Sequence, residues 1–218
     1  MHDRLICHPI SLYEFGDTGV GIANDPASLS AFLQPGCAAA IWRRQTPPEV
    51  QNWLDGLAPD ALPRGRAVLV PEMIPQTVTR LCETSGLSEG PERAWLQAAL
   101  ISLADKFRAL VPSKYLRLRL DVVTTNACRR FHIDAITARL VCTYRGTGTQ
   151  YGISTDGTPP SRVFTVQTGA PVLLRGTLWP EQPASGLLHR SPPIEGTGET
   201  RLVLVVDPIF DLDDAQLG

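Results

Sequence analysis

A histidine and an aspartate stand two residues apart in the segment His132-Ile133-Asp134. On a β-strand, residues i and i+2 project to the same face, so the imidazole and the carboxylate can close on one metal ion. By itself this short motif is a weak signal. It is followed, however, by His189 and then by Arg201, which opens an apolar run that ends at Asp207. The order H-x-D, His, Arg is informative.

Two histidines and one carboxylate on one face of an Fe(II) ion leave three coordination positions open, an arrangement that non-haem oxygenases use. We therefore predict that His132, Asp134 and His189 are the metal ligands and the catalytic centre. An arginine on the strand after the distal histidine can pair with the far carboxylate of a chelating dicarboxylate such as 2-oxoglutarate. Arg201 occupies that position.

Other readings of the same residues remain open. The two histidines can be hydrogen-bonded core residues without any metal. Cys128 or Cys142 can add a soft ligand, which favours zinc and a non-catalytic zinc-binding protein linked to metal homeostasis. In a cupin-like metalloenzyme without 2-oxoglutarate, Arg201 would instead bind an acid group of the substrate.

The spacing suggests further contacts around this centre. Tyr144, on the strand after H-x-D, and Ser191, two residues beyond His189, are candidates to bind the cosubstrate. Candidates to face the substrate, a small molecule or a peptide, are Arg139, Arg145 and Trp179. The alternative for Tyr144 is a half-buried aromatic ring, and for the arginines it is a solvated edge.

The motif resembles that of the Fe(II)/2-oxoglutarate dioxygenase superfamily over about residues 115–207. A closer resemblance is to the uncharacterised bacterial domain-of-unknown-function 1826 family. The runs that carry it are CRRFHID (128–134), RLVCTYRGTGTQ (139–150), HRSPP (189–193) and RLVL (201–204). The superfamily implies a double-stranded β-helix, Fe(II), 2-oxoglutarate and hydroxylation of a substrate, whereas the family implies no established reaction and leaves a zinc-related role open. Many such oxygenases have a serine two residues after the cosubstrate arginine, but here that residue is Val203.

The elements that position these residues change character near Pro112. Before it, helical signals predict helices at 46–57, 75–86 and 91–110, the last with leucines and Phe107 at spacings of three and four. After it, a period of two over 115–123 predicts a strand, and shorter strands are expected at 129–134, 138–145, 149–153, 162–167, 171–176, 185–190 and 201–207.

These elements predict an α+β protein in which N-terminal helices pack on a C-terminal double-stranded β-helix, that is, a jelly roll or cupin-like barrel. We expect one domain over 1–218, with a mainly helical buttress at 1–112 and a barrel with the metal site at 113–210.

Composition narrows the classes of partner. The formal net charge of −2 gives no reason to expect nucleic acid or an anionic membrane as the partner. Five scattered cysteines without a C-x-x-C pair, and an N-terminus unlike a signal peptide, predict reduced thiols and a cytoplasmic location. The oligomeric state and the substrate are left open.

Overall fold

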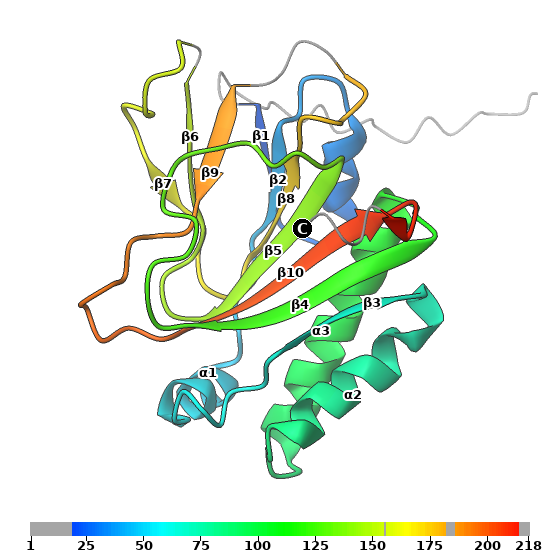
Figure 1. Cartoon of the computed structure of the whole chain (residues 1–218), viewed down its shortest axis with the longest axis vertical. Coiled ribbons are helices and arrows are strands. Elements are labelled where there is room, and N and C mark those ends of the chain that lie inside the picture. Colours follow the sequence, from blue (N-terminus) through cyan, green and yellow to red (C-terminus); the bar gives the residue numbers. More distant parts are fainter. Residues whose placement is uncertain (1–18, 155, 182–185, 214–218) are drawn as a thin grey trace, which may run out of the picture.

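A computed structural model describes residues 19–154, 156–181 and 186–213 of the chain. It is a mixed α/β structure with one large sheet, one small sheet and helices against the large sheet (Figure 1). Cys7 and the histidines of the N-terminal segment lie outside the described residues.

The large sheet has seven strands in the order β1-β2-β8-β5-β10-β4-β3. Its centre is antiparallel: β10 pairs with β4 on one side and with β5 on the other. The strands are β1 (Val20–Ala23), β2 (Ala39–Trp42), β3 (Gly65–Leu69), β4 (Tyr115–Val123), β5 (Ala138–Arg145), β8 (Pro171–Arg175) and β10 (Arg201–Ile209).

The small sheet has the order β7-β6-β9, with β6 (Gln150–Ile153), β7 (Phe164–Thr165) and β9 (Leu187–Arg190). From residue 115 onward the chain crosses repeatedly between the two sheets. It passes from β4 to a bridge at His132 beside β9, then to β5, to β6 and β7, to β8, to β9 and finally to β10. Residues far apart in sequence therefore meet between the two sheets.

Two apolar clusters hold these layers together. The first joins α3 (Pro91–Leu110) to the large sheet and includes Leu96, Leu100 and Phe107 of the helix with Leu118 and Leu204 of the strands. Two further helices, α1 (Pro48–Gly56) and α2 (Ile74–Thr84), and the short 3-10 helices η2 (Ala27–Leu33) and η3 (Pro71–Met73) complete the helical elements. The second cluster lies on the other face of the large sheet, where valines of β5, β8 and β10 pack with Leu187 of β9.

Hydrophobic periodicity predicted the boundaries of the long elements well. Helix α3 and strands β4 and β5 have the predicted limits. The N-terminal half also contains three short strands that were not predicted, β1, β2 and β3, and these extend the large sheet. The expected strand at 129–134 is reduced to a bridge at His132. None of the described helices has the length and apolar character needed to cross a membrane.

Candidate metal centre and its pocket

His132 and His189 are brought together by the small sheet. His132 lies in the segment before β5, and its backbone N–H and C=O exchange hydrogen bonds of 3.0 Å with those of His189 on β9. Directly opposite residues of an antiparallel pair carry their side chains on the same face. The two imidazole rings accordingly lie 4.6 Å apart between centroids.

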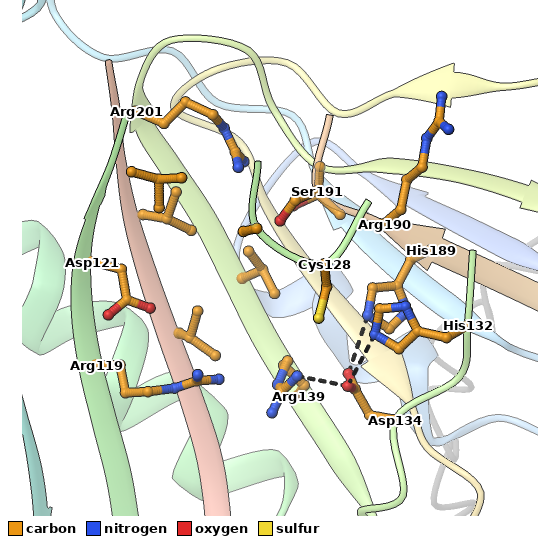
Figure 2. A pocket seen from close by; sticks show the side chains of 16 residues that line it. Arg119, Asp121, Cys128, His132, Asp134, Arg139, His189, Arg190, Ser191 and Arg201 are labelled. Atoms are coloured by element: carbon orange, nitrogen blue, oxygen red, sulfur yellow. Dashed lines mark ion pairs between the residues drawn. The ribbon is translucent and has the colours of Figure 1, made fainter. Parts of the chain in front are cut away.

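Asp134 completes a compact group with these histidines. Its Oδ1 atom lies 3.4 Å from His132 Nε2, and its Oδ2 atom lies 3.1 Å from His189 Nε2. One ligand atom from each of the three residues lies within 4.8 Å of the others. Figure 2 shows all three side chains converging on one point of the pocket.

The tautomer of His132 is fixed by a backbone contact. Its Nδ1 atom lies 2.8 Å from the carbonyl oxygen of Arg130, which can only accept a hydrogen bond. Nδ1 therefore carries a proton and donates it, and Nε2 is the nitrogen directed at Asp134 and His189. Histidine ligands of metals are commonly oriented in this way.

Arg139 of β5 holds Asp134 in its charged form. Its Nη1 atom lies 2.7 Å from Asp134 Oδ1. Burial alone would raise the pKa of the Asp134 carboxyl, but the adjacent His189, Arg139 and His132 lower it to about 2. Arg139 is itself fixed, because Nε and Nη2 donate to the two oxygens of the buried Asp207 at 2.6 and 2.9 Å.

The three side chains fit a divalent metal ion. Asp134 Oδ2 is buried and forms no hydrogen bond of good geometry with the described residues, although His189 Nε2 lies 3.1 Å away. A buried carboxylate oxygen without a donor is unfavourable unless a cation or water meets it. An ionised carboxylate and a neutral imidazole with its lone pair directed inward are the forms that metals bind.

Arg201 lies in the same pocket, at its other end. The residue is 1% exposed. Its Nε donates to the carbonyl oxygen of Thr147 at 2.6 Å and its Nη2 to Thr143 Oγ1 at 3.3 Å. No carboxylate of the described part of the chain forms an ion pair with it. Burial lowers the pKa of Arg201 to about 10, with Glu199 acting in the opposite direction.

The pocket between these two ends is lined by both sheets (Figure 2). Ser191 and Cys128 lie along it, and the backbone N–H of Ser191 donates to the carbonyl oxygen of Cys128. The wall formed by the large sheet includes Val141, Val203 and Val205. Arg139 also lines the pocket, but three of its N–H groups are already bonded to Asp134 and Asp207.

Three other residues expected at the site lie elsewhere. Tyr144 is fully buried in the core on the helical side of the sheet, where its hydroxyl accepts a hydrogen bond of 3.0 Å from Arg44. Arg145 donates to the carbonyl oxygens of Leu54 and Leu57 at the end of α1. Trp179 packs edge-on against Phe32 and lines a different pocket. Cosubstrate binding by Tyr144 and substrate contacts by Arg145 and Trp179 are therefore not retained.

The cysteines are also separated from one another. Cys142 faces the same core as Tyr144, and burial raises the pKa of its thiol to about 11. Cys128 is exposed at the pocket but is not part of the ligand group. The four cysteines of the described residues form no disulfide with one another.

The sequence reasoning missed Thr143, which bonds Arg201. The signal was present in the alternation of β5. Arg139, Val141 and Thr143 lie on one face of β5, and the first two line the pocket, whereas Leu140, Cys142 and Tyr144 share the face toward the core. Because Arg139 lines the pocket, the alternation along β5 places the Thr143 hydroxyl on the same face of the strand.

Solved structures of similar shape include several oxygenases. One is a dioxygenase for auxin oxidation in rice, with 15% identity, 87% of this chain and 80% of that chain covered, and a TM-score of 0.49. Another is a Pseudomonas putida prolyl-4-hydroxylase, with 13% identity, 86% and 100% covered, and a TM-score of 0.44. A third is a 2OG-Fe(II) oxygenase family oxidoreductase from Burkholderia pseudomallei, with 14% identity, 84% and 90% covered, and a TM-score of 0.41.

These structures differ too much from this chain to assign its function, so the functional argument is based on the residues of the site. A comparison with curated proteins found no match. The family model described as "Protein of unknown function (DUF1826)" matches residues 23–207, which include the triad of His132, Asp134 and His189. The chain therefore belongs to the DUF1826 family.

Proposed function

We propose that this protein is an Fe(II)- and 2-oxoglutarate-dependent oxygenase that hydroxylates a small-molecule or peptide substrate. One observation carries the proposal. The His132–Asp134–His189 group and the buried guanidinium of Arg201 share one pocket, and Arg201 has no carboxylate partner among the described residues. A buried cation of this kind is unfavourable without an anion, and a diffusible dicarboxylate supplies one.

The topology supports the same proposal. Eight segments are divided between two facing sheets, with the consecutive β6 and β7 both in the small sheet. This is the arrangement of a double-stranded β-helix, if the bridge at His132 is counted as the second strand. In that count, H-x-D lies at the second segment, His189 on the seventh and Arg201 on the eighth. This arrangement places the polar groups of the candidate site between the two sheets.

In this proposal, His132, Asp134 and His189 hold Fe(II), and Arg201 binds the distal carboxylate of 2-oxoglutarate. When bound, these two groups supply the activation of dioxygen for oxidation of the substrate. Arg139 keeps Asp134 ionised and oriented. Val141, Val203 and Val205 exclude water from the wall between the two ends, which strengthens the charged contacts.

A threonine of the neighbouring strand can replace the serine hydroxyl that many such oxygenases have two residues after the arginine. Val203 pairs with Thr143 of β5 in the register of the large sheet. The buried Thr143 hydroxyl accepts a hydrogen bond from Arg201, the residue that would bind the carboxylate. We propose that Thr143 contributes the hydroxyl at this end of the pocket, and Ser191 remains a candidate for a second.

An anaerobic titration tests the proposal. The protein is loaded with Fe(II) without oxygen, and 2-oxoglutarate is added while the visible spectrum is recorded. We expect a metal-to-ligand charge-transfer band that saturates, and succinate formation after oxygen is admitted. A protein that carries stoichiometric metal but gives neither signal would contradict the proposal. Zinc bound tightly and retained against Fe(II) would favour the non-catalytic zinc-binding protein.

A further inference from the structure

The wall of the pocket across from the triad carries a guanidinium and a carboxylate on one strand. Arg119 and Asp121 of β4 are two residues apart, so both project to the pocket face, with their Cα atoms about 7 Å apart. Both line the same pocket as the triad. Figure 2 shows them on the opposite side of the pocket from His132, Asp134 and His189.

Arg119 retains unused hydrogen-bonding capacity. Its Nε atom is buried and has no hydrogen-bond partner in the structure. Its only ion pair among the described residues is at 3.5 Å, from Nη2 to Asp207 Oδ2. That carboxylate already accepts two shorter hydrogen bonds from Arg139, at 2.6 and 2.9 Å. Arg119 is therefore a half-buried cation that can still bind an acid group.

Asp121 is the complementary group. Within the described part of the chain, its carboxylate forms no hydrogen bond or ion pair, and it does not pair with the neighbouring Arg119. A carboxylate and a guanidinium that face one cavity and are not closed on each other leave room for a molecule between them. The molecule that satisfies both carries an acid group and an ammonium group.

These two residues are separate from the expected cosubstrate position. Arg119 pairs with Val205 of β10, four residues along that strand from Arg201, or about 13 Å. Asp121 pairs with Val203, which lies between Arg201 and Val205 on β10, and its carboxylate would repel a dianion such as 2-oxoglutarate from the Arg119 position. The pocket thus has one end suited to a dicarboxylate and a second position suited to a zwitterion.

We propose that Arg119 and Asp121 recognise the substrate, and that the substrate is a zwitterion of the amino-acid class. Arg119 binds its carboxylate and Asp121 binds its ammonium group. The assignment rests on the proposed oxygenase function, because it takes the triad as the reacting end of the pocket. It specifies the substrate class that the proposed function leaves open.

Binding to the Zn(II)-loaded protein tests this without any turnover. Binding of each free proteinogenic amino acid is measured first by calorimetry. The methyl ester and the N-acetyl derivative of any amino acid that binds are then measured in the same way. We expect at least one amino acid to bind, and each blocked derivative to bind about thirty-fold more weakly, because it lacks one of the two charges.

Two variants assign the two charges to the two residues. Arg119→Gln should remove the preference for the free acid over the methyl ester while keeping the preference against the N-acetyl derivative. Asp121→Asn should do the reverse. The exposed helix α3 residues Arg108 and Asp105 provide matched controls, so Arg108→Gln and Asp105→Asn should leave both preferences unchanged.

The inference is overturned if no amino acid binds at millimolar concentration, or if both blocked derivatives bind as tightly as the free form. A 2-oxoglutarate titration of the Fe(II) protein is run in parallel. A normal charge-transfer band without amino-acid binding would leave the oxygenase proposal intact and reject the substrate class. Amino-acid binding with both preferences and no band would support the zwitterion site and reject the cosubstrate.

Discussion

His132 and His189 are directly opposite partners in an antiparallel bridge, and each donates its backbone N–H to the carbonyl of the other at 3.0 Å. The spacing of two ligands of the candidate metal site is therefore fixed by main-chain geometry and not by side-chain packing alone. Asp134 is not part of this backbone pair, and its carboxylate is held instead by the ion pair with Arg139. The variants below distinguish these two kinds of support.

Removal of any ligand of the triad should abolish most of the metal content. His132→Ala, Asp134→Ala and His189→Ala each delete one of three ligands, which no neighbouring group of the described residues replaces. Elemental analysis of the purified variants measures this. Cys128→Ser is the control, because Cys128 lines the pocket outside the ligand group and should leave metal content unchanged. Undiminished metal in the triad variants would show that the ligands lie elsewhere.

Arg201→Gln should prevent 2-oxoglutarate binding while leaving metal content nearly unchanged. Loss of one half of a buried charge-assisted pair costs about 2–5 kcal/mol of binding free energy. Arg201→Lys should keep part of the affinity, since it keeps the charge without the planar fork. The anaerobic charge-transfer titration measures both. A band of wild-type strength in Arg201→Gln would move the carboxylate contact to another residue.

Arg139 should act as a positioning residue for Asp134. Arg139→Met leaves the 1% exposed side chain of Asp207 without its bidentate partner, so we expect a loss of about 3–5 kcal/mol in the free energy of unfolding. Urea unfolding of the metal-free protein measures it. The double variant Arg139→Met, Asp207→Leu removes both charges and should recover part of that stability, yet its metal affinity should stay reduced because Asp134 has lost its contact. Full recovery of metal affinity would exclude the positioning role.

Gly176 should be required for the placement of Asp134. A Cβ atom added at Gly176 would lie 1.9 Å from the carbonyl oxygen of Ile136 and 2.8 Å from that of Asp134. Gly176→Ala must therefore displace the loop, and we expect lower thermal stability and weaker metal binding together. Gly56→Ala is the control, because a Cβ there meets nothing within 4 Å. Metal affinity at the wild-type level in Gly176→Ala would mean that the loop does not set the ligand geometry.

The alternation of the sequence predicted the long elements, because each exposes a clear apolar face. Strand β4 alternates between Leu118 or Leu120 toward the helices and Arg119 or Asp121 toward the pocket. The short strands β1, β2 and β3 were missed, because four or five residues carry too little pattern and are held in the sheet by partners distant in sequence.

At the site, the spacing of His132, Asp134, His189 and Arg201 identified residues that the structure brings into one pocket. Tyr144 was misassigned, because its proximity in sequence to the motif outweighed its position on the core face of β5. The links from Arg139 to Asp207 and from Arg201 to Thr147 depend on which strands are neighbours, and no local pattern encodes that.

The valines of the large sheet have a consequence for the length of the ligand. The triad is held by the small sheet and its adjoining loop, whereas Arg201 belongs to the large sheet. Val141, Val203 and Val205 line the pocket between them and pack in one apolar cluster with Leu187. Facing sheets are separated by about 10 Å, a value that the volume of these side chains sets. The thickness of this apolar layer therefore limits the length of a diacid that could reach from one sheet to the other. For the diacid that we propose to bind here, a bulkier residue at Val205 should widen the gap between the sheets and shift the preference toward longer diacids.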